Sequence, residues 1–208
     1  VVIPTYCERE NIGPLLRRLD GVRARLGEPL EVIVVDDGSE DGTAECARQM
    51  QGLTIPVTVL GQVAPEGLTA AVLQGIGCAR GDLVGIMDAD LSHPPEALPQ
   101  MIKPLLKKEA ELVVGSRYIK GGGVEVWPFH RRLTSKVATL MAWPLTRIKD
   151  PMSGLFFLRR SVLEGVKLNA KGYKIGLEVL VKGKYGKVME VPYTFRNRFV
   201  GKSKLTMP

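Results

Sequence analysis

Two carboxylates, Asp88 and Asp90, stand two residues apart at the end of an apolar run, residues 83–87. The run is typical of a buried strand, and the Pro94-Pro95 pair that follows is typical of the start of a helix. Carboxylates at positions i and i+2 of a strand end can share a hard divalent cation, which takes oxygen ligands and accepts substrate phosphates as the others. A solvated turn, or Asp90 acting as a helix N-cap, would account for the same residues. The pattern by itself leaves both interpretations open.

A second acidic cluster, Val-Asp-Asp-Gly-Ser at residues 35–39, follows another apolar segment. Asp37 can accept hydrogen bonds from a nucleobase or a ribose. The loop has no G-x-G-x-x-G pattern, which argues against NAD as the ligand, and the chain has no complete G-x-x-x-x-G-K-[ST] pattern of a P-loop. His93 and His130 have no obvious nucleophile beside them, so catalysis by a Ser-His-Asp or Cys-His set is not indicated.

Four cationic side chains are available to a phosphate-bearing ligand: Arg117, Arg131, Arg198 and Lys204. Arginine binds phosphate bidentately, whereas lysine acts as a point charge. Together with a metal at the carboxylate pair, these groups would stabilise the charge that builds on a departing nucleoside diphosphate. The combination favours glycosyl transfer from a sugar nucleotide over hydrolysis, although composition leaves a phosphatase open.

Strand-like and helix-like segments alternate along the first half of the chain. Short apolar strands are expected at residues 1–3, 31–35, 57–60, 83–87 and 112–115, with helices at 10–25, 42–50, 68–79 and 95–108. The alternation predicts an α/β fold, a Rossmann-like, mainly parallel sheet flanked by helices on both faces. Four polar clusters each follow one of these strands, at residues 5–8, 36–39, 88–90 and 116–118. Because ligands of such sheets bind beyond the carboxyl ends of the strands, we expect the clusters to form a single site.

The pattern changes after the three glycines at residues 121–123. The elements expected beyond them are an amphipathic helix at 129–143, a strand at 154–158, a helix near 173–182, a strand at 187–191 and a Gly/Ser/Lys-rich loop at 199–208. The amphipathic helix would either pack on the core or lie on a membrane surface. We expect residues 1–208 to form one domain, and either end can be truncated because the chain begins in mid-strand without Met.

Composition narrows the class of partner. The chain of 208 residues has a net charge of +7, and residues 167–208 hold ten Lys and Arg against Glu178 and Glu190. A basic end can meet nucleic acid, an anionic membrane surface or a phosphorylated substrate, but no RNP, zinc-finger or helix-turn-helix signature points to nucleic acid. No apolar run reaches the 18 or so residues of a membrane span. The three cysteines lack CxxC spacing and predict neither zinc nor a disulfide framework.

Five blocks, in this order, carry a resemblance to a known family: Pro-Thr-Tyr-Cys-Glu-Arg-Glu-Asn at 4–11, Val-Asp-Asp-Gly-Ser at 35–39, Asp-Ala-Asp-Leu-Ser-His-Pro-Pro at 88–95, Gly-Ser-Arg-Tyr at 115–118 and Gly-Lys-Ser-Lys-Leu at 201–205. Together they resemble the dolichyl-phosphate mannose synthases, which are family 2 inverting glycosyltransferases with the GT-A fold. The similarity spans essentially the whole chain. Asp-Ala-Asp alone is weakly specific, whereas the five blocks together are strong evidence.

The resemblance implies a role for each matching position. The guanosine of GDP-mannose would be held by Pro4, Tyr6, Glu8, Val35 and Asp37. The ribose and diphosphate would lie against Asp88, Ala89 and Asp90. The metal, Mg²⁺ or Mn²⁺, would be bound directly by Asp90, with Asp88 and Ser92 beside it. The donor phosphates would be bound by Arg117, Arg198 and Lys204, and the acceptor phosphate by Arg131 with Ser135.

Two positions depart from the family pattern. Ser92 stands where some relatives have Gln beside the metal, which leaves water as an alternative to a third protein ligand. Cys7 stands where many relatives have Asn, between two residues that would contact the donor.

The implied reaction is a single displacement in which mannose passes from GDP-mannose to a polyprenyl (dolichyl) phosphate at the cytoplasmic face of a membrane. Some family members carry transmembrane helices after the catalytic domain, and others rely on a membrane-anchoring subunit. One alternative is the same fold acting on UDP-glucose, or another sugar nucleotide, with undecaprenyl phosphate. A more distant alternative is a non-catalytic nucleotide-binding or membrane-docking module driven by the basic end.

Overall fold

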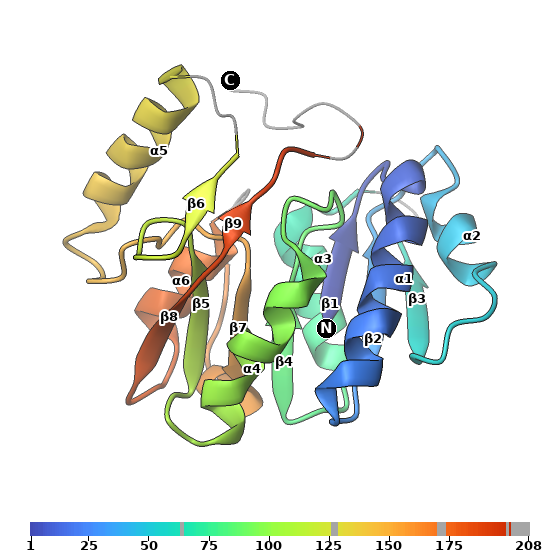
Figure 1. The fold of residues 1–208 in the computed structure, drawn as a ribbon, viewed down its shortest axis with the longest axis horizontal. Coiled ribbons are helices and arrows are strands. Elements are labelled where there is room, and N and C mark those ends of the chain that lie inside the picture. The colour runs from blue at the N-terminus through green and yellow to red at the C-terminus, as the bar shows by residue number, and fades with distance from the viewer. Residues whose placement is uncertain (63–64, 126–128, 170–173, 199, 201–208) are drawn as a thin grey trace.

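The computed structural model describes residues 1–62, 65–125, 129–169, 174–198 and 200, and of residues 129–133 it describes the backbone alone. Strands and helices alternate through the first half of the chain as predicted (Figure 1). The strands of the main sheet are β1 (Val2–Thr5), β2 (Val32–Asp36), β3 (Val57–Gly61), β4 (Leu83–Ile86), β5 (Leu112–Ser116), β7 (Phe156–Arg159) and β8 (Val188–Pro192). The helices are α1 (Arg9–Leu26), α2 (Thr43–Arg48), α3 (Leu68–Cys78), α4 (Leu98–Leu106), α5 (Phe129–Ala142) and α6 (Ile175–Lys182), with 3-10 turns η1 (Pro95–Ala97) and η2 (Arg160–Leu163).

The main sheet is mostly parallel, and its strand order is β3-β2-β1-β4-β7-β5-β8. The central strands pair in register, for example Val2 with Ile33 and Thr5 with Asp36. One strand runs the other way, because β7 is antiparallel to both β4 and β5. The predicted α/β fold with a mainly parallel sheet is confirmed, and the direction of β7 is a feature that the apolar pattern did not contain.

Helices cover both faces of the sheet because alternate strand residues point to opposite sides. On one face, α1 and α4 pack against residues such as Ile3 and Val34. On the other face, α3 and α6 pack against residues such as Ile33 and Val84. Gly75 allows α3 to approach β1 closely, since a Cβ there would lie 2.3 Å from Cγ1 of Val2. This contact holds β1, and therefore the residues that follow it, firmly in the sheet.

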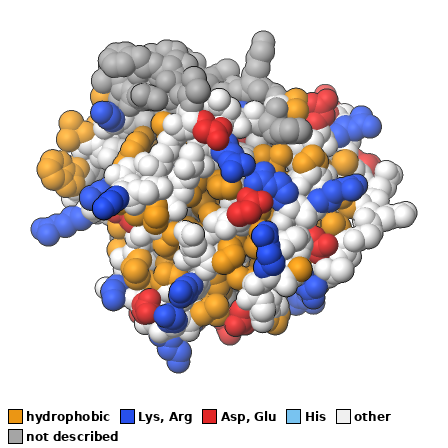
Figure 2. All heavy atoms as spheres, viewed as in Figure 1, with side chains coloured by type: hydrophobic (Ala, Val, Ile, Leu, Met, Phe, Trp, Pro, Cys, Tyr) orange, Lys and Arg blue, Asp and Glu red, His pale blue; other side chains and the backbone are white. Residues whose placement is uncertain are grey.

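Two short strands, β6 (Gly123–Val124) and β9 (Thr194–Phe195), form a separate parallel pair that the sequence did not predict. The predicted amphipathic helix is present as α5, which stands beside this pair rather than on a face of the main sheet (Figure 1). None of the helices within the described ranges has the length and apolar character needed to cross a membrane. On the face of the molecule in Figure 2, Lys and Arg side chains are scattered among acidic ones.

Candidate active site

The predicted polar clusters meet at one edge of the sheet, where β1, β2, β4 and β5 end. A cavity of about 470 Å³ lies there. Its lining includes nine of the predicted site residues: Pro4, Tyr6, Glu8, Asp37, Asp88, Ala89, Asp90, Arg117 and Arg198. These residues come from five separate stretches of the chain, so the fold brings together what the sequence keeps apart.

Five further predicted residues are not among those that line the cavity. Val35 lies in the sheet core, and Ser92 is fully buried behind Asp90. Ser135 lies on α5, where it contacts Tyr118. The side chain of Arg131 and all of Lys204 lie outside the described residues. The roles expected for these five residues stay predictions.

Asp90 is held in place by two contacts, one to each carboxylate oxygen. The backbone N–H of Ser92 donates a hydrogen bond of 3.0 Å to Oδ1, and Nε of Arg198 lies 3.0 Å from Oδ2. The turn that allows the first contact passes through Leu91, which has a φ of 62°. This left-handed conformation is strained for a branched side chain, and such strain is concentrated at functional sites. Ser92 therefore fixes Asp90 through its backbone, while its own hydroxyl has no hydrogen-bond partner within the described ranges.

His93 orients the segment that carries Asp88. The backbone N–H of Asp88 donates to Nδ1 of His93 at 3.2 Å, and the same nitrogen lies 3.7 Å from Oδ2 of Asp88. Burial raises the pKa of the Asp88 carboxyl; His93 opposes the rise, and the charges of Asp90 and Glu8 add to it. The side chain nevertheless keeps 41% of its surface accessible, as expected for a group on the floor of an open cavity. Negative charge is thus concentrated where a cation would relieve it.

The donor set at this position suits a hard divalent cation. Asp88 and Asp90 both line the cavity with carboxylate oxygens, the ligands that Mg²⁺ and Mn²⁺ prefer. Among the residues that the structure describes, no group of three or more His, Cys, Asp or Glu side chains is close enough to hold a metal alone. The site therefore fits an ion that takes its remaining oxygens from a bound diphosphate.

The loop after β2 is braced by its own carboxylates. Asp36 accepts hydrogen bonds from the hydroxyls of Ser39 at 2.7 Å and Thr5 at 3.0 Å. Asp37 accepts from the backbone N–H groups of Glu66 at 2.7 Å and Gly67 at 3.0 Å. Asp37 therefore ties the start of α3 to the cavity rim, in addition to presenting its carboxylate there. Charge-assisted bonds of this kind are strong and short, which makes the rim rigid.

The turn between β1 and α1 brings Glu8 to the cavity. Its backbone N–H donates to Oγ1 of Thr43 at 2.9 Å, and its carboxylate accepts from Nδ2 of Asn11 at 2.6 Å. The preceding residue, Cys7, has a φ of 53°. A non-glycine residue in this region is uncommon, and Asn is favoured there several-fold.

Arg117 lines the cavity with its guanidinium group locked against a buried acid. Nε and Nη2 of Arg117 donate to the two carboxylate oxygens of Asp150, at 2.7 and 2.6 Å. The backbone N–H of Arg117 donates to the same carboxylate at 2.9 Å. Burial lowers the pKa of Arg117, but the hydrogen bonds and charge of Asp150 outweigh it and raise the pKa overall. A planar group held in this way has a fixed orientation.

Several lining residues were missed by the sequence reasoning, among them His93, Ser153, Gly154 and Phe195. Two of them precede β7. Because β7 is antiparallel to its neighbours, the residues before it reach the edge that the other strands reach with the residues after them. Asp150 belongs to the same turn. Its position, an acidic residue just before the strand expected at 154–158, is the feature of the sequence that could have identified it.

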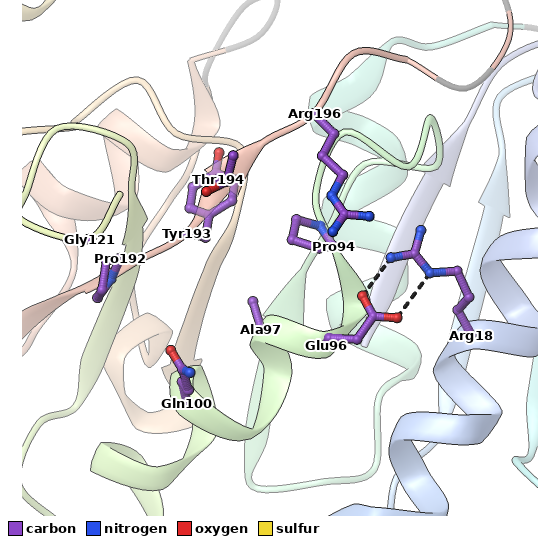
Figure 3. Close-up of a pocket in the computed structure, with 10 residues that line it drawn as sticks. All are labelled: Arg18, Pro94, Glu96, Ala97, Gln100, Gly121, Pro192, Tyr193, Thr194 and Arg196. Atoms are coloured by element: carbon purple, nitrogen blue, oxygen red, sulfur yellow. Dashed lines mark hydrogen bonds and ion pairs between the residues drawn. The ribbon is translucent and has the colours of Figure 1, made fainter. Parts of the chain in front are cut away.

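A second and larger cavity, of about 710 Å³, lies on the α1 and α4 side of the molecule (Figure 3). Its lining includes Arg18 and Glu96, which form a two-pronged ion pair, together with Arg196 and Tyr193. None of the predicted site residues lines it. This cavity is the larger of the two, but Asp88, Asp90, Arg117 and Arg198 all line the smaller one. The smaller cavity is therefore the candidate active site.

Comparison with known sequences agrees with the motifs. A family model described as glycosyl transferase family 2 matches residues 1–166. The dolichol-phosphate mannosyltransferase of Pyrococcus furiosus is 49% identical to this chain over 209 residues, which cover 99% of the chain and 58% of that protein. The protein of the same name from Saccharomyces cerevisiae is 38% identical over 216 residues, 99% of the chain and 80% of that protein. The chain thus spans little more than half the length of the first relative.

Solved structures with the same fold are more distant in sequence. Mannosyl-3-phosphoglycerate synthase from Rubrobacter xylanophilus superposes with a TM-score of 0.72 at 20% identity, covering 96% of this chain and 66% of that one. Glucosyl-3-phosphoglycerate synthase from Mycobacterium tuberculosis, in complex with Mn²⁺, UDP and phosphoglyceric acid, gives 0.69 at 23% identity, covering 98% and 70%. These similarities support the arrangement of sheet and helices described above.

Proposed function

This chain belongs to glycosyl transferase family 2, and from that premise we propose that it transfers mannose from GDP-mannose to a polyprenyl (dolichyl) phosphate at a membrane surface. The named mannosyltransferases of Pyrococcus furiosus and Saccharomyces cerevisiae, at 49% and 38% identity, support this choice of donor sugar and acceptor class. The proposal treats residues 1–208 as one catalytic domain.

The observation that carries the proposal is the arrangement around Asp90. The cavity presents two carboxylates, Asp88 and Asp90, while Arg198 lies 3.0 Å from Asp90 and Arg117 also lines the cavity. Acids and arginines therefore line the same cavity. A diphosphate bridged to the protein by a metal needs both, because its oxygens face the metal on one side and arginines on the other.

Asp88 and Asp90 would hold Mg²⁺ or Mn²⁺, with the diphosphate supplying further ligands. When bound, such an ion neutralises the charge that develops on the departing diphosphate. The solved glucosyl-3-phosphoglycerate synthase structure in complex with Mn²⁺ and UDP supports the use of a divalent metal. Ser92 contributes by fixing Asp90 through its backbone N–H.

The donor base would lie in the apolar part of the cavity. Pro4, Leu68, Ala71 and Val72 line this part, between β1 and α3, and Tyr6 and Glu8 lie on the rim. A carboxylate such as Glu8 can accept hydrogen bonds from the N–H groups of guanine, whereas uracil offers one N–H. This difference in donors supports GDP over UDP.

The transfer is a single displacement. An oxygen of the acceptor phosphate bonds to C1 of mannose, while the bond from C1 to the β-phosphate oxygen breaks and its electron pair leaves with GDP. The configuration at C1 inverts, so an α-linked donor gives a β-linked product. Because a phosphate monoester is already largely anionic near neutral pH, no side chain has to remove a proton. The protein's contribution is to position both phosphates, with Arg117, Arg198 and Lys204 on the donor and Arg131 with Ser135 on the acceptor.

A polyprenyl acceptor requires the domain to work at a bilayer, and α5 supplies a suitable surface. Leu140, Met141 and Trp143 have 64%, 75% and 67% of their surfaces exposed. Lys136 and Arg147 are exposed alongside them. Apolar side chains with flanking basic ones suit a helix that lies in the interface of an anionic membrane. Anchoring by a membrane subunit or by further helices, and action at the cytoplasmic face, are parts of the proposal that the family resemblance supports.

The test is a transfer assay that offers GDP-mannose and UDP-glucose separately to a short polyprenyl phosphate in detergent or vesicles. The proposal predicts lipid-linked mannose from GDP-mannose, dependent on Mg²⁺ or Mn²⁺, and at most trace product from UDP-glucose. Efficient transfer from UDP-glucose would support the alternative donor instead. Tight nucleotide binding without transfer from either donor would support a non-catalytic module.

A further inference from the structure

Helix α5 is joined to the domain by a hydrogen bond between two hydroxyls. Oη of Tyr118 lies 2.6 Å from Oγ of Ser135, and both side chains are partly buried. Tyr118 is the second residue after β5, whereas Ser135 lies in the middle of α5. The bond therefore connects the edge of the sheet that carries the donor cavity to the helix that stands beside it.

Tyr118 is itself fixed against the donor cavity. Its ring lies under the guanidinium of Arg117, with 5.3 Å from Cζ to the ring centre. That guanidinium is held by Asp150, and the turn containing Asp150 is held in turn by Glu190, which accepts from the backbone N–H of Asp150 at 3.2 Å. Phe195 lies on the same guanidinium at 5.6 Å. Tyr118 therefore has little freedom, and it presents its hydroxyl to Ser135 at a fixed place.

We propose that Tyr118 is a positioning residue for the acceptor: its phenol donates to Oγ of Ser135 and thereby directs the hydroxyl hydrogen of Ser135 toward an anionic phosphate monoester. The inference rests on the proposed function for the identity of the acceptor. It rests equally on the proposed role of Ser135, and it adds a residue that would act on the acceptor through Ser135.

The chemistry of the two hydroxyls gives the bond its direction. A phenol is more acidic than an aliphatic alcohol, so in a pair of this kind the tyrosine is the better donor and the serine the better acceptor. A hydroxyl that accepts one hydrogen bond becomes a stronger donor for the next, which strengthens a chain from Tyr118 through Ser135 to a phosphate. A serine hydroxyl that lacks such a donor can rotate to the carbonyl of the preceding turn of its helix instead.

The experiment is a double-mutant cycle of Tyr118→Phe, Ser135→Ala and the double variant, with two readouts. The first is the KM for a short polyprenyl phosphate in the transfer reaction, at saturating GDP-mannose and Mg²⁺. The second is calorimetric binding of a short-chain alkyl phosphate to the protein saturated with Mg²⁺ and GDP, which requires no turnover. Tyr185→Phe is the matched control, because it also removes a phenol hydrogen bond, to the carbonyl of Leu180, and neither residue lines the cavity.

The proposal predicts that Tyr118→Phe raises the acceptor KM and the alkyl-phosphate Kd by about three- to tenfold, the range of one neutral hydrogen bond. The double variant should be no worse than Ser135→Ala, because the two side chains act as one chain. The Kd for Mg²⁺ with GDP should not change, and Tyr185→Phe should leave both acceptor readouts at the wild-type values. A residue that only supports the fold would instead alter donor and acceptor binding together.

Three results would overturn the inference: wild-type acceptor affinity in Tyr118→Phe, additive effects in the double variant, or no binding of the alkyl phosphate by the wild-type protein. Failure of the proposed function has a different signature, the absence of mannose transfer by the wild type. In that case the calorimetric cycle still decides the role of Tyr118, because it depends on phosphate binding alone.

Discussion

Nε of Arg198 lies 3.0 Å from Oδ2 of Asp90, so the residue proposed to bind a donor phosphate is paired with the residue proposed to bind the metal. The two residues are far apart in the sequence, and both line the same cavity. In this arrangement the arginine neutralises Asp90. Binding of a metal with a diphosphate would replace that contact by a metal–carboxylate contact and give Arg198 a phosphate oxygen instead. The ion pair and the substrate complex are then alternatives for the same carboxylate.

This exchange predicts opposite effects of Arg198→Gln on two affinities. The Kd for GDP-mannose with Mn²⁺ should rise about 10- to 100-fold, because a charge-assisted hydrogen bond to phosphate is lost. The Kd for Mn²⁺ alone should fall about two- to fivefold, because Asp90 loses a competing partner of the kind found near a protein surface. Calorimetric titration measures both. Arg196→Gln, whose arginine pairs loosely with Glu125 at 3.8 Å, is the matched control and should change neither. Weaker binding of Mn²⁺ alone in Arg198→Gln would contradict the exchange.

Because the pKa of Asp88 is raised, we expect Asp88→Asn to make the protein more stable and less active. A carboxyl whose folded-state pKa is raised binds its proton more tightly in the folded protein than in the unfolded one. The free energy of unfolding therefore falls as pH rises from the unfolded-state pKa of Asp88 to its folded-state pKa. Asp88→Asn should therefore make the metal-free protein more stable at neutral pH and remove this part of the pH dependence, while transfer is lost.

Thermal unfolding of wild type and Asp88→Asn between pH 4 and pH 8, with metal chelated, measures this effect. The two curves should converge toward low pH, where Asp88 is protonated in the wild type. A variant that is less stable than wild type at neutral pH would show that the charged carboxylate stabilises the fold.

The space between Gly154 and the carboxylate of Asp88 is too small for a larger side chain at position 154. A Cβ at this position would lie 3.1 Å from Oδ2 of Asp88 and 3.2 Å from Cε1 of His93. Gly154→Ala should displace Asp88 and cost about 1–3 kcal/mol by overpacking, with metal-dependent donor binding weakened more than about tenfold. Gly77→Ala, in α3 with open space around it, is the control and should stabilise the protein by about 0.5–1 kcal/mol. Unchanged donor affinity in Gly154→Ala would mean that Asp88 has room to move.

We expect the substitution Cys7→Asn, next to the candidate site, to stabilise the protein. Its φ of 53° lies in the left-handed region, which Asn adopts more readily than Cys. Cys7→Asn should raise the free energy of unfolding by about 0.5–1 kcal/mol. Chemical denaturation with an unchanged m-value measures this gain. Cys78→Asn, at the last residue of α3, changes the same side chain without the strained backbone and should give no gain. An equal gain at both positions would assign the effect to removal of the thiol.

The order of strands and helices could be predicted because it is written in local apolar periodicity. The ends of β1, β2, β4 and β5 could be predicted as one edge for the same reason, since parallel strands joined by helices have their carboxyl ends together. Asp37, Asp88 and Arg117 therefore reach one cavity as the sequence indicated. What each side chain contacts there could not be predicted, because it depends on pairing between distant segments.

The direction of β7 is the clearest example. The apolar residues at 154–158 predict a strand, but nothing in their pattern gives its direction, which is set by pairing with β4 and β5. The consequence is that Gly154, just before β7, lines the cavity and that Asp150, in the same turn, holds Arg117; neither was foreseen. The β6–β9 pair escaped prediction because two-residue strands have no periodicity to detect.

The most direct test of the proposed reaction is metal-dependent mannosyl transfer by the wild type and by Asp90→Asn, with the anomeric configuration of the product determined by NMR. Asp90→Asn keeps the size of the side chain and removes its charge, and folding is checked by circular dichroism. We predict β-linked polyprenyl-phosphate mannose and GDP from the wild type only when Mg²⁺ or Mn²⁺ is present, and a rate lower by about 100-fold or more in Asp90→Asn. Transfer that persists undiminished in Asp90→Asn, or an α-linked product, would contradict the account.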